Sequence, residues 1–242
     1  MIFINNDYKI LRGFSLAETL IAVVILGILA AITVTSVIKN CQKTQTLTKL
    51  KKTYSAINQA IDISVIENGP VDTWQGTSQE KIRDYIIPYF KVREVITLPE
   101  ARRRAGKYYE ISGNQERGLT IMGIGEADNR AYAINLRDNT QIWIIHSSIL
   151  MTFLVDLNGS KKPNTFGKDV FMLRYFINDN YFDFDSKCDG GTAKYQKRSV
   201  EDLKIGNPCR SDKYGCNKNG RGMWCGALIE ASGWKFPKDY PW

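Results

Sequence analysis

Three oxygen-bearing side chains mark a stretch of the sequence with the spacing of a cation-binding loop. Asp156 and Asn158 stand at alternate positions, Gly159 follows them, and Asp169 ends the stretch. Oxygen ligands at alternate positions before a glycine turn are how a calcium loop begins, so calcium is the candidate ion. The EF-hand pattern is incomplete, because no glutamate closes it and three lysines lie within it. We therefore favour a rigid strand-to-strand connection built from Asx turns, glycine and proline, and expect no other cofactor.

Cysteine spacing indicates disulfide chemistry in the last quarter of the chain. Four cysteines lie there: Cys188, Cys209, Cys216 and Cys225. The surrounding sequence is rich in glycine, asparagine and lysine, and such a segment needs cross-links to be ordered. Zinc is disfavoured, because no close Cys-x-x-Cys pair is present and His146 is the only histidine. Three pairings are open, and short loops favour Cys188–Cys209 with Cys216–Cys225. The fifth cysteine, Cys41, is expected to be a small, semi-buried side chain.

The sequence contains no convincing catalytic group, and we expect that the protein is not an enzyme. His146 is followed by two serines, but a triad also needs a distant orienting acid and an oxyanion hole. We therefore interpret His146 as a residue at a sheet edge. Four aromatic residues lie near the C-terminus: Trp224, Trp234, Tyr240 and Trp242. They could stack on a sugar or peptide, but such residues more often cover a small cross-linked subdomain.

The strongest functional signal is a lone carboxylate inside an apolar run. Between Phe14 and Val37 the only charged residue is Glu18. This run is long enough to span a bilayer as a helix, where a charge is costly and rare. A short polar leader ends at Gly13, where a protease could cut. A secretory signal is cut after its apolar region, whereas this junction lies before it, so the apolar run would stay on the mature protein.

The order of Gly13, Phe14, Glu18 and an apolar span resembles the N-terminus of the type IV pilin and type II secretion pseudopilin family. The resemblance covers residues 11–66. It implies that a prepilin peptidase cuts between Gly13 and Phe14 and methylates Phe14. It also implies that Glu18 pairs with the N-terminal amine of a neighbouring subunit during filament assembly. Many family members have a proline where Thr35 stands, so a proline kink is not expected here.

The resemblance implies a structural subunit of a type IV pilus or a type II secretion pseudopilus. Such a subunit is anchored in the inner membrane, with its N-terminus inside and its C-terminal domain outside. The alternative is a minor tip pilin that binds DNA, glycan or cargo through residues 188–242. The formal net charge of +8 fits contact with anionic lipid. We favour lipid over DNA, because no nucleic-acid-binding motif accompanies this charge.

One long helix should carry the apolar run out of the membrane. No glycine or proline lies between Gly27 and Gly69, so nothing ends the helix before that point. From Leu47 to Val65, apolar residues recur every three or four positions and form one stripe. Residues 14–37 are therefore expected to form the transmembrane half, and residues 38–67 an outer half that packs on a sheet.

The rest of the chain predicts a short helix and an antiparallel sheet. The helix is expected over residues 78–92, with Ser78 as its cap. Segments rich in β-branched and apolar residues predict strands at 119–122, 131–136, 141–145, 150–156 and 170–177. Asp138 and Asn139 indicate a hairpin turn, and the connections are too short for crossover helices, which favours a meander.

Together these elements predict an α+β, pilin-like fold with a long N-terminal helix packed on the sheet. An apolar content of 43% excludes wholesale disorder, and 242 residues suffice for an anchor plus one domain. The expected organisation is a leader at 1–13, the helix, a globular domain at 68–187 and a cysteine-rich region of the same domain at 188–242.

Overall fold

The computed structural model describes residues 15–97, 100, 103, 107–116, 131–159, 161–184, 198–206 and 214–242. The chain divides after Thr44 into two compact units, Met1–Thr44 and Gln45–Trp242. The strand expected at 119–122 lies outside the described residues.

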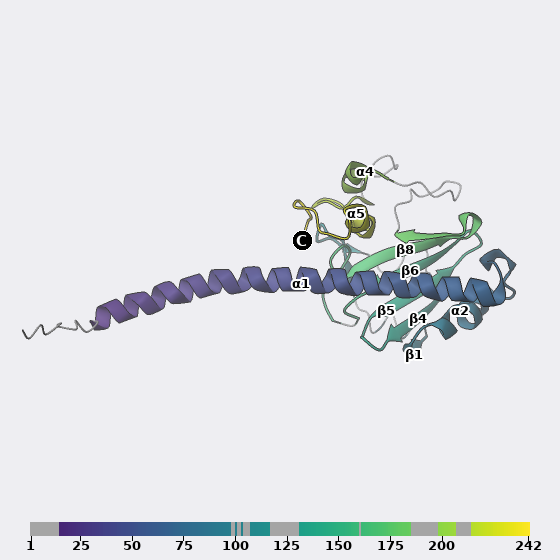
Figure 1. Ribbon diagram of the computed structural model, residues 1–242, viewed down its shortest axis with the longest axis horizontal. Helices are drawn as coiled ribbons and strands as arrows, with labels where there is room; N and C mark the ends of the chain where they lie inside the picture. The colour runs from purple at the N-terminus through teal and green to yellow at the C-terminus, as the bar shows by residue number, and fades with distance from the viewer. Residues whose placement is uncertain are drawn as a thin grey trace, which may run out of the picture. The chain divides into compact units, whose positions relative to one another are not determined.

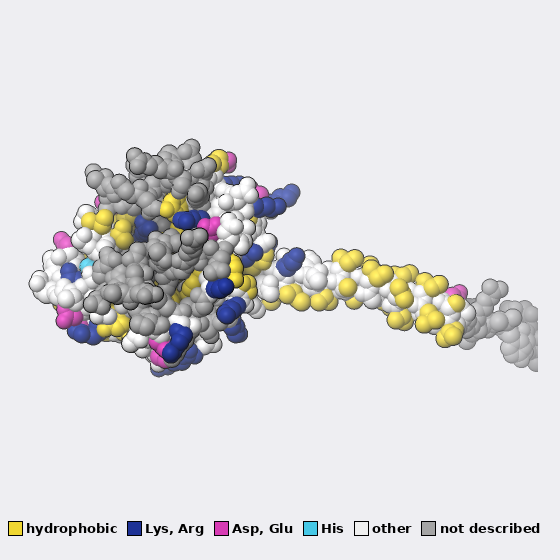
Figure 2. Space-filling model, turned by 180° about the vertical axis from the view of Figure 1, so that it is seen from behind, with side chains coloured by type: hydrophobic (Ala, Val, Ile, Leu, Met, Phe, Trp, Pro, Cys, Tyr) yellow, Lys and Arg dark blue, Asp and Glu magenta, His cyan; other side chains and the backbone are white. Residues whose placement is uncertain are grey.

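Helix α1 (Leu16–Asn68) begins in the first unit. There its apolar side chains are exposed; Leu20, for example, keeps 60% of its surface. Figure 2 shows these hydrophobic side chains along the helix. In length and composition the helix is able to cross a membrane. An apolar surface of this kind needs lipid or other apolar surface to cover it, as the sequence predicted for a single-pass anchor.

The part of α1 that belongs to the second unit is amphipathic. Six residues of the helix are buried: Leu50, Thr53, Ile57, Ala60, Ile61 and Ser64. Their spacing of three and four positions places them on one face. Leu47, Tyr54 and Val65 are partly buried against the same core, so the predicted apolar stripe is confirmed. Tyr54 lies 5.0 Å from Phe182 and 5.2 Å from Phe184, measured between ring centroids.

The buried face of α1 shares one hydrophobic core with a six-stranded antiparallel sheet, whose strand order is β1-β4-β5-β6-β8-β9 (Figure 1). Its strands are β1 (Val92–Ile96), β4 (Ala131–Leu136), β5 (Gln141–His146), β6 (Leu150–Asp156), β8 (Val170–Phe176) and β9 (Tyr181–Phe184). Four of the predicted strands are therefore confirmed, as is the turn at Asp138 and Asn139, where Asn139 has a positive φ of 64°. A second sheet has the order β3-β2-β7. Its strands are β3 (Gln115–Glu116), β2 (Tyr108–Tyr109) and β7 (Asn164–Thr165).

The short second helix differs from the prediction over 78–92. Helix α2 (Ser78–Tyr85) is followed by the 3₁₀ turn η2 (Ile87–Tyr89) and then by β1. Pro88 lacks a backbone N–H and cannot continue an α-helix, which explains the early end. The cap is Thr77 and not Ser78, because Thr77 forms a capping box with Glu80.

The C-terminal region adds two short helices, α4 (Val200–Ile205) and α5 (Cys225–Ala231). They pack on each other, and α5 also packs on β8 and β9. A Cβ atom at Gly226 would lie 2.2 Å from Cδ1 of Phe184. A glycine at this position therefore allows the first turn of α5 to approach β9 closely.

Candidate functional site

Glu18 lies in the first turn of α1 and forms a capping box with Ser15. The Ser15 N–H and hydroxyl donate to Glu18 Oε2 at 2.8 and 2.9 Å, and the Glu18 N–H donates to Ser15 Oγ at 3.2 Å. This reciprocal pattern satisfies backbone donors at the helix start. The cap was missed in the sequence, although the Ser-x-x-Glu spacing is its usual signal. Gly13 and Phe14 lie outside the described residues, so cleavage and methylation there stay predictions.

The Asp-Leu-Asn-Gly loop connects β6 to β8 and is held by its own hydrogen bonds. The Asn158 N–H donates to Asp156 Oδ1 at 3.1 Å, as in an Asx turn. The Asn158 amide donates to Asp169 Oδ2 at 2.6 Å, and the Thr165 N–H donates to Asp169 Oδ1 at 2.5 Å. Both oxygens of Asp169 are therefore occupied by donors of the loop itself.

The two carboxyl groups of this loop are hard to ionise. Asp156 is fully buried, and burial, with a further contribution from the charge of Asp169, raises its pKa to about 8. Burial also raises the pKa of Asp169 to about 6, although hydrogen bonds from Thr165 and Asn158 oppose this shift. Lys49 donates from Nζ to the carbonyl oxygens of Leu157 and, at 3.0 Å, of Asp138. Its ammonium thus binds the backbone beside the loop.

These contacts decide how well the loop suits a cation. Asp156 Oδ2 and Asn158 Oδ1 are buried oxygens of the loop without a hydrogen-bond partner in the described structure. Calcium takes six to eight oxygens, and no cluster of three or more acidic, histidine or cysteine residues for a metal exists within the described ranges. In the described geometry the loop is held by hydrogen bonds of its own side chains. Calcium stays a prediction, and Asp156, Asn158 and Asp169 are the residues that would hold it.

Two further polar side chains lie close to this loop but far from it in sequence. Gln141 of β5 is the direct cross-strand partner of Asp156. Tyr108 of β2 is buried, and burial followed by the charge of Asp156 raises the pKa of its hydroxyl. Neither the Tyr108 hydroxyl nor Gln141 Oε1 has a hydrogen-bond partner in the part of the chain that is described. Buried polar groups of this kind are costly, and no local pattern in the sequence pointed to them.

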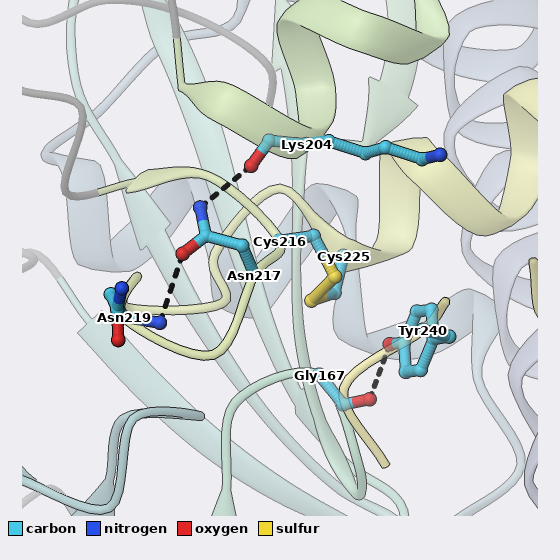
Figure 3. The surroundings of a disulfide bond; sticks show 7 residues. All are labelled: Gly167, Lys204, Cys216, Asn217, Asn219, Cys225 and Tyr240. Carbon is cyan, nitrogen blue, oxygen red and sulfur yellow. Dashed lines mark hydrogen bonds between the residues drawn. A yellow bond between two sulfur atoms is a disulfide. The ribbon is translucent and has the colours of Figure 1, made fainter.

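Cys216 and Cys225 form a disulfide, which is the pairing favoured from the sequence. Figure 3 shows it beside the hydroxyl of Tyr240, which donates to the carbonyl oxygen of Gly167. Gly167 has a φ of +81°, and a Cβ atom there would lie 2.6 Å from Cys225 Sγ. Only glycine fits such a position without strain, so the end of the Asp156–Asp169 loop and the disulfide pack directly on each other.

The other cysteines and the aromatic residues can now be placed. Cys188 and Cys209 lie outside the described residues, so their pairing stays a prediction. Cys41 is exposed on α1, not semi-buried as predicted. Trp224 and Tyr240 are buried in the core, and Trp234 and Trp242 pack against it, which confirms that these aromatic residues build the cross-linked region.

His146 was wrongly placed at a sheet edge. It is the last residue of β5, which lies inside the sheet between β4 and β6, and it is buried. Burial, with the nearby charge of Lys81, lowers the pKa of the imidazole to about 4. The ring is therefore neutral at physiological pH.

Fold and sites together define an α+β protein whose N-terminal helix is able to cross a membrane and whose C-terminal region carries a disulfide. The sequence model of a protein family described as "Family of unknown function (DUF6613)" matches residues 36–242, and the chain belongs to this family. The match covers the whole second unit and leaves out the N-terminal motif. No curated protein and no solved structure matches the chain.

Proposed function

We propose that the chain is a prepilin-like structural subunit of a type IV pilus or a type II secretion pseudopilus. The observation that carries this proposal is the start of α1. There a single carboxylate, Glu18, follows the Gly13–Phe14 junction, and the helix beyond it exposes an apolar surface. A plain signal anchor would account for the apolar surface but not for the junction and the carboxylate together.

The energetics of the helix support an assembly role. Its apolar side chains are suited to lipid in the free subunit and to neighbouring helices in a filament, so transfer between the two environments has little net cost. A carboxylate in such surroundings needs a partner, because an unpaired buried charge is strongly destabilising. The terminal amine that cleavage would create at Phe14 on a neighbouring copy supplies the opposite charge to Glu18.

The proposal assigns three partners to the chain. A prepilin peptidase cuts after Gly13, the inner membrane holds the helix with its N-terminus inside, and other subunits pack against the helix outside the membrane. The alternative role as a minor tip pilin would place ligand binding in residues 188–242. In that region Trp224 and Tyr240 are buried and contribute to the core, which gives the structural role better support.

Mass spectrometry of the mature protein tests the proposal. We expect Phe14 as the N-terminal residue, carrying one added methyl group. Gly13→Trp should leave the precursor uncut in the membrane, because the peptidase requires a small residue before the cut. A matched control, Asn6→Trp, changes the leader away from the junction and should be processed normally. An intact Met1 on the assembled protein would overturn the proposal.

A further inference from the structure

The outer half of α1 borders a groove with a positively charged rim. The groove has a volume of about 530 Å³ and lies between α1, the residues after η2 and the turn between β4 and β5. Its apolar lining includes Ala56, Ala60, Ile63, Phe90 and Leu136. Ile63 keeps 43% of its surface exposed, so the groove offers apolar area that a partner can cover.

Two cations at the rim of this groove are available to a partner. Lys52 is paired with Asp138 at 2.9 Å, so it is already neutralised. Lys91 and Arg137 also line the groove, and both are exposed. Neither has an acidic partner within the described residues. Next to them, Arg93 donates to Asn139 Oδ1 at 2.6 Å and adds a third positive charge.

The opposite flank of α1 carries acidic side chains. At 100° per residue, Asp62 points to the other side of the buried stripe from Ile63 and Ala56. Asp72 lies on η1 (Val71–Thr73), which packs against η4 (Ile177–Asp179), the turn that follows β8. Figure 1 shows β8 on one side of α1 and β4 on the other. Both carboxylates are exposed.

The packing of η1 on η4 places Asp72 beside the end of β8, and Tyr175 is the residue of β8 on which both acids act. Burial, then the charges of Asp62 and Asp72, raises the pKa of its hydroxyl to about 12. Both carboxylates therefore act on the same buried group from the β8 side of the helix. The chain as a whole has a formal net charge of +8, so its cations outnumber the carboxylates that could pair with them.

We propose that two copies of this chain bind through these opposite flanks, with Asp62 and Asp72 of one copy against the rim cations Lys91 and Arg137 of the next. The inference rests on the proposed function, since it specifies how subunits contact each other outside the membrane. Such a contact joins different surfaces on the two copies, so it leaves one flank of each copy open and propagates along a filament. Complementary charges fix the register of this contact and disfavour wrong partners.

Charge reversal tests the contact in the full-length chain in membranes. One double variant is Lys91→Glu with Arg137→Glu, and the other is Asp62→Lys with Asp72→Lys. Each variant has two flanks of like sign and should not bind itself. A mixture of the two should bind again, because each reversed flank then meets its opposite. Lys235→Glu with Lys238→Glu, at exposed positions of the C-terminal segment, lowers the net charge by the same amount as the Lys91 and Arg137 variant and serves as its matched control.

The measurement is zero-length coupling of amines to carboxylates in a mixture of unlabelled and ¹⁵N-labelled copies. Mass spectrometry then identifies links between different copies. We expect an isotope-mixed link from Lys91 to Asp62 or Asp72 in the wild type and the control. In each double variant alone, the yield of links between copies should fall about tenfold or more below that of the wild type, because like charges in contact repel strongly. The mixture of the two variants should restore this yield.

The outcomes separate this inference from the proposed function. If wild type and both double variants assemble equally well, the inference is overturned and the proposed function stands. If the wild type forms no link of any kind between copies, both are overturned. A variant with reversed Lys91 and Arg137 that assembles normally but loses binding to anionic vesicles or duplex DNA would overturn the inference in favour of that occupant.

Discussion

Asp156 should make the stability of the second unit depend on pH in a direction opposite to that of an ordinary paired carboxylate. The pKa of its carboxyl is raised from 3.8 to about 8 in the folded state, so the folded chain holds this proton more tightly than the unfolded chain. The stabilising contribution is fully present below the unfolded pKa. It is lost as pH rises from about 4 through about 8.

The magnitude follows from the width of that window. One pKa unit corresponds to about 1.4 kcal/mol. Asp169, with a pKa of about 6, is already half ionised at pH 6 and is almost fully ionised well before pH 8, so the change between pH 6 and pH 8 comes chiefly from Asp156. Asp156→Asn removes the titrating group but keeps an oxygen that can accept from the Asn158 N–H. The free energy of unfolding of the wild type should therefore fall by about 2 kcal/mol from pH 6 to pH 8, relative to that of the variant.

Urea unfolding of both proteins at a series of pH values, followed by tryptophan fluorescence, measures this difference. Glu201→Gln, at an exposed position of α4, is the matched control and should run parallel to wild type. If the Asp156→Asn curve also runs parallel to wild type from pH 6 to pH 8, our account of the buried carboxyl is wrong.

The same titration tests the candidate calcium site. A bound cation stabilises the folded state and favours the ionised carboxylate. If the loop binds calcium, millimolar calcium should raise the wild-type unfolding midpoint at pH 8 and leave Asp156→Asn unchanged. Equal effects on both proteins would rule out a site that depends on this carboxylate.

Three further predictions concern the helix start, the disulfide and the approach of α5 to the sheet. Glu18→Ala should insert in the membrane but assemble poorly in the absence of wild-type subunits. Ser15→Ala removes the cap but keeps the carboxylate, so it should assemble. Electron microscopy of filaments distinguishes the two variants. Non-reducing digestion should yield the peptides of Cys216 and Cys225 joined, and reduction should cost about 2–4 kcal/mol of unfolding free energy. Gly226→Ala should cost about 1–3 kcal/mol, because the added methyl group meets an aromatic ring of β9; an unchanged urea midpoint would contradict that packing.

Elements that depend on nearest neighbours in sequence were predicted well. The stripe from Leu47 to Val65 identified the buried face of α1, because helical periodicity is a local property. The four central strands and the turn at Asp138 and Asn139 were also recognised from local composition. The helix was predicted to continue to residue 92 because its apolar residues keep a helical spacing. Pro88, which lacks a backbone N–H, indicates the earlier end.

Elements that depend on distant partners were missed. Strand β1 is defined by its pairing with β4, which is separated from it by about 40 residues. Strands β2 and β7 pair in parallel across more than 50 residues, and neither is long enough to show a period. The interior position of His146 likewise follows from the strand order and not from its neighbours.

By itself, the sequence determined the apolar helix, its lone carboxylate, the α+β class and the segment that carries the disulfide, because each is set by composition or by spacing along one element. Only the tertiary structure decided the environment of each functional group. In the sequence Asp156 ends a predicted strand and is a candidate cation ligand, but only the fold shows that it is fully buried and that burial raises its pKa. Lys91 and Arg137 are far apart in the sequence, and only the fold places them at the rim of the same groove. Burial and charge clustering arise from contacts between distant segments, which local sequence patterns do not encode.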